Sequence, residues 1–114
     1  MIEKIIRDYL NSIAGAPPAY MEIPAERPTQ PFFVIQKTSG GEIEGHVGEA
    51  TLVIQSYGST LYEAAYTNEL LKTFMADAVE LPEITAVRLN SDYNFTDLTG
   101  KHYRYQAVYQ IVHY

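Results

Sequence analysis

Three histidines and a few serines are the side chains of this sequence that could most readily bind a metal ion or take part in catalysis. His46, His102 and His113 show no metal-ligand spacing such as His-x-x-x-His, so we expect surface or interface roles for them. The serines of residues 55–59 lack the Gly-x-Ser-x-Gly setting of a hydrolase nucleophile. The chain has no cysteine, which excludes a thiolate nucleophile and cysteine-rich zinc sites. We therefore expect no catalytic residue, no metal ion and no cofactor.

Acidic and amide side chains concentrate in residues 91–97, where the spacing of Asp92, Asn94 and Asp97 is similar to that of a calcium-binding loop. An EF-hand loop needs glycine at its sixth position and glutamate at its twelfth, but here these positions hold Asp97 and Tyr103. Calcium binding of that kind is excluded. Short Asp and Asn side chains also bond to their own backbone, so we interpret these residues as turn formers.

Length and charge restrict the possible functions. A chain of 114 residues fits one domain, residues 1–114. Its net charge of -6 opposes binding to a phosphate backbone, so we expect no binding to duplex DNA. The sequence has no apolar run long enough to span a membrane and begins with no secretory signal, which predicts a protein kept in the cytoplasm.

Ten tyrosines in so short a chain point to contact surfaces, because tyrosine is enriched where proteins meet. Tyr103, Tyr105 and Tyr109 share one face of a predicted strand. They fit a half-buried core and a protein contact face equally well. Stacking of single-stranded bases is a weaker alternative, since the chain is acidic.

Two helices position these residues in the predicted fold. Apolar residues recur at helical spacing from Ile2 and stop before Gly15 and two prolines. Thr60 and Glu63 form a capping box that starts a second helix, which Pro82 closes. The small residues of that helix would let it lie close to a sheet.

Period-two alternation predicts about four to five strands. The predicted strands are residues 19–23 (weak, at an edge), 32–38, 50–57, 84–90 and 103–114. Residues 40–48, rich in glycine, and residues 91–102 are the predicted hairpin loops. The pattern predicts an α+β fold, with an antiparallel sheet and both helices packed on one face, in the order α-β-β-β-α-β-β.

Several segments resemble a family of phage minor capsid or tail terminator proteins, found in long-tailed phages and prophages of Gram-positive bacteria. The most specific are residues 89–97 (LNSDYNFTD), which lead into residues 103–109 (YRYQAVY). Residues 50–57 with the alanine-rich helix, and residues 21–24 (MEIP), add to the likeness. It extends over nearly the whole chain.

The resemblance implies a single tail-terminator-like domain that is a structural protein of the virion and not an enzyme. Such subunits assemble as a hexameric ring on the head-proximal end of the tail tube, halt its growth and join the tail to the neck. The implied partners are further copies of the chain, the tail tube protein and a neck or head completion protein, with no membrane. DNA would be only a cargo that passes through the lumen. The implied location is the tail–neck junction of the virion, and the host cytoplasm during assembly.

The resemblance carries over contact roles and no catalytic ones. In the first hairpin loop the candidate contact residues are Gly41, Glu42, Glu44 and His46. In the second loop and the strand after it they are Asp92, Tyr93, Asn94, Phe95, Asp97, Lys101 and Arg104. A further hypothesis is that Glu42, Glu44 and Glu49 line the bore and repel DNA phosphates.

Two alternatives remain open at the level of sequence. One is a head completion or neck protein that bridges portal and tail, which would bind heads without tubes. The other is a small-molecule-binding or enzymatic α+β domain, which would need a concave apolar pocket with convergent polar groups.

Overall fold

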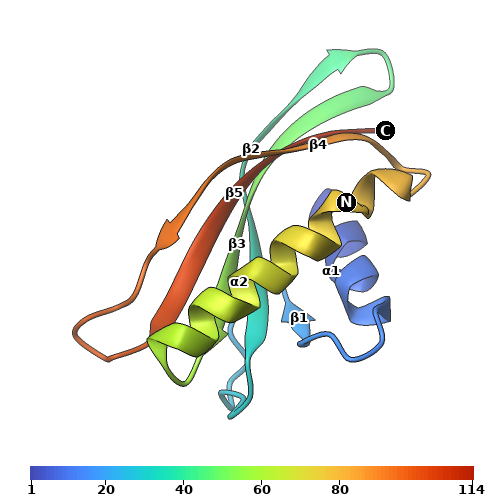
Figure 1. The fold of residues 1–114 in the computed structure, drawn as a ribbon. Coiled ribbons are helices and arrows are strands. Elements are labelled where there is room, and N and C mark those ends of the chain that lie inside the picture. Colours follow the sequence, from blue (N-terminus) through green and yellow to red (C-terminus); the bar gives the residue numbers. More distant parts are fainter.

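The elements follow the order α-β-β-β-α-β-β in the computed structural model, which describes residues 1–114, and this confirms the α+β prediction (Figure 1). The elements are α1 (Ile2–Ser12), β1 (Ala19–Tyr20), β2 (Phe32–Glu44), β3 (Val47–Gly58), α2 (Leu61–Ala76), the 3-10 helix η1 (Ala78–Glu80), β4 (Ile84–Asn94) and β5 (Tyr103–His113). The five strands form one sheet in the order β1-β2-β3-β5-β4. Neighbours are antiparallel except β1 and β2, which are parallel.

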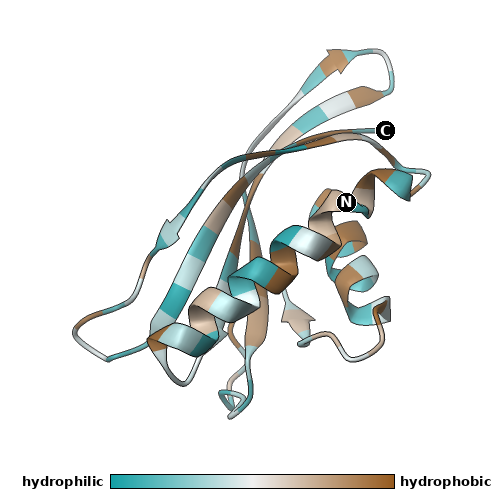
Figure 2. Ribbon diagram, in the orientation of Figure 1, coloured by the Kyte–Doolittle hydropathy of each residue, from teal (hydrophilic) through white to brown (hydrophobic).

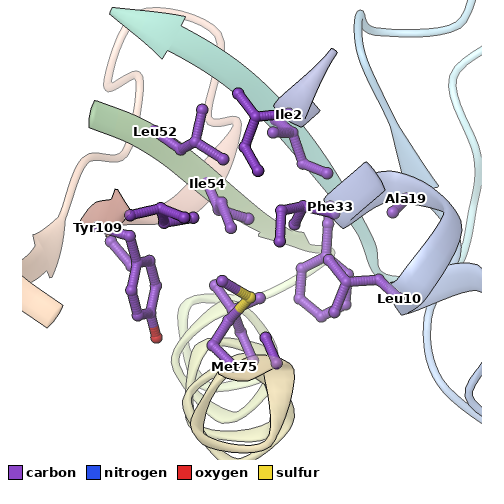
Figure 3. Packing of buried hydrophobic residues seen from close by; sticks show 14 of the residues in the cluster. Ile2, Leu10, Ala19, Phe33, Leu52, Ile54, Met75 and Tyr109 are labelled. Carbon is purple, nitrogen blue, oxygen red and sulfur yellow. The ribbon is translucent and has the colours of Figure 1, made fainter. Parts of the chain in front are cut away.

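One face of the sheet carries the main core, and both helices lie on that face. Alternate residues of β2, β3 and β5, such as Phe33, Ile54 and Tyr109, point toward the helices and are almost fully buried. Leu10 of α1 and Met75 of α2 meet them from the other side, as Figure 3 shows. Period-two alternation in the strands therefore determines which face the helices cover.

The opposite face of the sheet has a smaller apolar cluster and many polar side chains. Phe32, Val34 and Tyr57 form that cluster, with Tyr20 packed against it. Hydrophilic bands alternate with apolar or neutral ones along β5, as Figure 2 shows. The two faces of this sheet are thus chemically different, and only one is covered by helices.

The end of α1 is fixed by Gly15, which the sequence predicted, and by the side chain of Asn11. Gly15 has a φ of +79°, the left-handed conformation that glycine adopts at little cost. The Asn11 side chain then accepts from the Ala19 N–H at 2.8 Å and donates to the Ala19 carbonyl at 3.0 Å. These bonds hold β1 at the edge. That strand is shorter than predicted, because it pairs only with Phe33 and Val34.

The predicted loop at residues 40–48 is wrong, because the two strands continue through it. β2 runs to Glu44, β3 starts at Val47, and Gly45 and His46 alone form the turn. Gly45 has a φ of +57°, as tight hairpin turns require. Backbone pairing needs no buried side chain, so Gly40 and Gly41 pair with β3 although the register shifts on either side of them, between Lys37 and Ser39 and between Glu42 and Glu44.

The second predicted loop, residues 91–102, is also too long. β4 continues to Asn94, with a register shift between Leu89 and Ser91. The connection that remains is residues 95–102. An isolated bridge pairs Asp97 with His102, so the unpaired part is shorter still.

The capping box at the start of α2 is confirmed. The Glu63 N–H donates to Thr60 Oγ1 at 3.0 Å, and Glu63 Oε1 accepts from the Ser59 N–H at 2.8 Å. The helix ends at Ala76, earlier than Pro82, because the chain turns through η1 and buries Ala78 against the core.

Candidate contact surfaces

The distal hairpin, residues 39–49, projects beyond the body of the sheet (Figure 1). Gly41, Glu42, Glu44 and His46 all lie on it and are exposed, so the structure brings these four predicted residues together. Ile43 lies between the two glutamates, and 54% of its surface is exposed. The tip therefore presents one apolar side chain flanked by two carboxylates.

A second group of predicted residues lies at the opposite end of the sheet, around Arg104 of β5. Its guanidinium carbon lies 4.7 Å from the centre of the Phe95 ring, and its Nε donates to the Phe95 carbonyl at 2.7 Å. Arg104 Nη1 also donates to the Tyr57 hydroxyl at 3.1 Å. Tyr93 meets the Phe95 ring edge-on at 6.0 Å. Phe95 and Tyr93 are each 41% exposed, so this end offers aromatic surface around a fixed cation.

Asn94 and Asp97 shape the connection as predicted. Asn94 Oδ1 accepts from the Thr96 N–H at 3.0 Å, and Asp97 Oδ1 accepts from the Thr99 N–H at 3.1 Å. Lys101 follows with a φ of 52°, and its side chain is exposed.

Asp92 has a different role from the one predicted, because it lies within β4 and faces α2. Its Oδ2 accepts from Asn68 Nδ2 at 2.7 Å and from Lys72 Nζ at 3.1 Å. The hydrogen bonds to Asp92 and Glu69 raise the pKa of Lys72. Asp92 therefore ties β4 to α2, and its interpretation as a turn former is wrong.

A hollow of about 350 Å³ lies at the same end of the sheet as Arg104; we call it the basic hollow. It is lined by residues 27–30, Phe32, residues 57–59, Lys101 and His102. The Arg27 guanidinium lies 5.3 Å from the centre of the Tyr57 ring and contacts His102 Nδ1 at 2.6 Å. Arginine only donates, so His102 Nδ1 is the acceptor in this contact.

Cations gather around this hollow although the chain is acidic. Of its eight Lys and Arg side chains, Lys4, Arg7 and Lys72 form ion pairs within the chain. Among the five that form none, Arg27 and Lys101 line the hollow, and Arg104 bonds to a tyrosine in its wall. None of these three side chains forms an ion pair within the chain, so their charge is available to a partner.

The floor of the hollow is rigid. Phe32 and Tyr57 stack with ring centres 4.7 Å apart and ring planes 2° from parallel. The Tyr57 hydroxyl donates to Gln55 Oε1 at 3.1 Å, and Gln55 donates to Gln106 Oε1 at 3.0 Å. Gln106 in turn donates to the Tyr93 hydroxyl at 2.6 Å. This chain of hydrogen bonds crosses the open face of the sheet and fixes Tyr57 in place.

Sequence reasoning did not single out Arg27, Phe32 or Tyr57. Arg27 lies in a proline-rich connection, and the two aromatic residues have the spacing of ordinary strand residues. The signal that could have found them is the register, since Phe32 pairs with Tyr57 across β2 and β3.

A third exposed surface lies on α2. Tyr62 and Tyr66 stack with ring centres 6.5 Å apart, and they are 80% and 55% exposed. With Ala65 and the half-buried Tyr105 they surround a shallow hollow of about 270 Å³. Tyr109, by contrast, is 3% exposed and belongs to the core. Of the tyrosines of β5, Tyr109 is thus buried in the core, whereas Tyr103 and Tyr105 are half-buried.

Ionisation of Tyr109 is expected to make the fold sensitive to alkali. Burial and, less strongly, the Asp92 carboxylate raise the pKa of Tyr109 far above its ordinary value. Above about pH 10 the unfolded chain ionises this hydroxyl while the folded chain keeps its proton, so stability falls by about 1.4 kcal/mol per pH unit. Below that pH its contribution is complete.

Replacing Tyr109 by phenylalanine should remove this slope and leave stability at pH 7 nearly unchanged. Urea unfolding between pH 7 and pH 12 measures it, with the exposed Tyr62→Phe as the matched control. A slope that Tyr109→Phe and Tyr62→Phe change equally would contradict the assignment.

No protein-family model matches the chain, and comparison with curated proteins gives no match. Neither helix is long and apolar enough to cross a membrane. No three side chains among His, Asp and Glu are grouped so as to hold a metal ion. The basic hollow has two aromatic residues in its wall, Phe32 and Tyr57.

Proposed function

We propose that this chain is a structural virion protein that caps the head-proximal end of a phage tail tube, stops its growth and joins tail to neck. It acts as a ring of identical subunits, which binds the tube on one side and a neck or head completion protein on the other. DNA passes through the lumen of the ring as cargo. No chemical step is involved.

The observation that carries the proposal is that residues 89–97, which resemble part of the tail terminator family, carry exposed aromatic side chains. Residues 89–97 and 103–109 form the paired ends of β4 and β5, where Tyr93 and Phe95 are exposed. The Tyr62–Tyr66 stack adds a second aromatic surface on α2. Exposed tyrosine and arginine are the side chains that contribute most at protein interfaces.

Purified chain should bind one end of tail tubes assembled from the tube protein of the same genome. Electron microscopy should show a cap on that end only, and tube lengthening should stop once the cap is bound. Tyr62→Ser with Tyr66→Ser tests the aromatic surface on α2, and Glu3→Lys on α1 is a control that should bind as the unchanged chain does.

Binding to portal-filled heads in the absence of tubes would instead favour the head completion role. Tubes that keep growing in the presence of excess chain would overturn the terminator proposal.

A further inference from the structure

The two charged surfaces of this chain lie at opposite ends of its long axis, which measures 44 Å. The distal hairpin is at one end (Figure 1). The basic hollow is at the other, where Arg27 contacts His102 of the β4–β5 connection. Neither surface can reach the other within one chain. Any contact between them must join two copies.

The hairpin and the hollow are chemically complementary. Glu42 and Glu44 flank the exposed Ile43 at the hairpin tip, and none of these carboxylates has an ion-pair partner in the chain. The hollow offers Arg27 and Lys101, also without ion-pair partners, beside a floor of stacked aromatic rings. The carboxylates of the hairpin can pair with the cations of the hollow, and the Ile43 side chain can pack on its aromatic rings.

The hollow is suited to a narrow projecting segment. Its volume of about 350 Å³ holds a few side chains and no more. The distal hairpin is only two strands wide and ends in a two-residue turn. It projects beyond the body of the fold, so it can enter a neighbour without the two bodies colliding (Figure 1).

We propose that the distal hairpin of one copy docks in the basic hollow of the next, so that the subunits join head to tail. This inference rests on the proposed ring function and names its subunit contact. The two surfaces of such a contact differ, and a contact of that kind repeats from copy to copy until it closes into a ring. It places Glu42 and Glu44 against the neighbour instead of the bore.

The absence of cysteine allows a direct test by cross-linking. His46→Cys puts a thiol at the hairpin tip, and Thr29→Cys puts one in the wall of the hollow, with every Lys, Arg, Asp and Glu retained. A chain that carries both changes is treated with a short bismaleimide, alone at high concentration and on tail tubes. The expected result is a ladder of linked chains that ends at the ring's subunit number.

Three control chains define the background. Each single-cysteine variant should give no ladder, and Glu80→Cys with Thr29→Cys should give none either, because Glu80 lies on η1, away from the hairpin tip. Linked dimers without higher species would indicate a reciprocal pair of copies and would overturn the head-to-tail arrangement.

Charge reversal tests the chemistry of the contact. Lys101→Glu alone, and Glu42→Lys with Glu44→Lys alone, should each lower the cross-linking yield by about tenfold. The three changes combined in one chain should restore much of it. Reversal variants that link as well as the parent would overturn the proposal, as would binding of inorganic phosphate or single-stranded DNA that Lys101→Glu abolishes while linking persists.

The proposed function and this inference fail in different ways. A ladder in solution, with no cap on tail tubes, would support the contact and reject the terminator role. Capped tubes without any cross-link would support the terminator role and reject this contact.

Discussion

Replacing Phe33 by alanine is expected to lower the free energy of unfolding by about 3–5 kcal/mol, a large part of a typical domain's stability. Phe33 is 0% exposed and lies in the main core, between β2 and the helices (Figure 3). Alanine would remove most of the ring's buried surface and leave a cavity that close-packed neighbours fill only in part. Urea unfolding of the dilute chain measures the loss.

Phe95→Ala is the matched control, because it is the same chemical change at an exposed position. Phe95 is 41% exposed and contacts Arg104, so its replacement is expected to cost less than about 1 kcal/mol. Equal losses for the two variants would show that Phe33 is not a core residue. Because Phe95 lies in a proposed contact surface, Phe95→Ala also separates effects on binding from effects on folding.

Much of the fold was predictable because it depends on local patterns. Helical spacing from Ile2 and the pair Thr60 and Glu63 identified both helices, and the structure confirms the capping box. Alternation along β5 placed Tyr109 on a single face, which turned out to be the core face. In each case one short segment contained the whole signal.

The strand ends were harder to predict because glycine and polar residues are poor guides to an exposed strand. Residues 40–44 contain two glycines and no buried side chain, yet they continue β2. Pairing with β3 holds them, and it continues to the Glu44–Val47 pair after a register shift between Glu42 and Glu44. Such pairing is a property of two segments together, and neither segment shows it alone.

The basic hollow could not be predicted from the sequence, because it too depends on segments that only the fold brings together. Its walls come from three separate parts of the chain, which lie in residues 27–32, residues 57–59 and residues 101–102. The net charge of -6 is that of an acidic protein, and this argued against a cationic site. The net charge describes the average surface, whereas the fold brings Arg27, Lys101 and Arg104 together at one end and Glu42 and Glu44 at the other.

Gly58 is the residue on which the packing at the hollow end of the molecule depends most. It is the last residue of β3, it pairs with Tyr103 of β5, and it lies in the wall of the basic hollow. A Cβ atom added there would lie 2.5 Å from the Ala64 nitrogen and 2.9 Å from the Glu63 carbonyl carbon. Both are backbone atoms in the first turn of α2, so no flexible side chain can move aside.

Gly58→Ala is therefore expected to push the start of α2 away from the sheet and to lower the free energy of unfolding by about 1–3 kcal/mol. Gly41→Ala is the matched control, since an added Cβ meets nothing within 4 Å there and should cost no stability. Urea unfolding compares the two, and equal stability would contradict the close approach of α2 to β3.

The same pair of variants connects this packing to the proposed subunit contact, because Gly58 borders the hollow whereas Gly41 lies on the hairpin itself. Each change is added to the chain that carries His46→Cys and Thr29→Cys. The folded fraction of Gly58→Ala should then form fewer cross-links between the two introduced thiols than Gly41→Ala does. A lower cross-linking yield for Gly58→Ala than for Gly41→Ala would show that the packing of α2 determines the shape of the hollow.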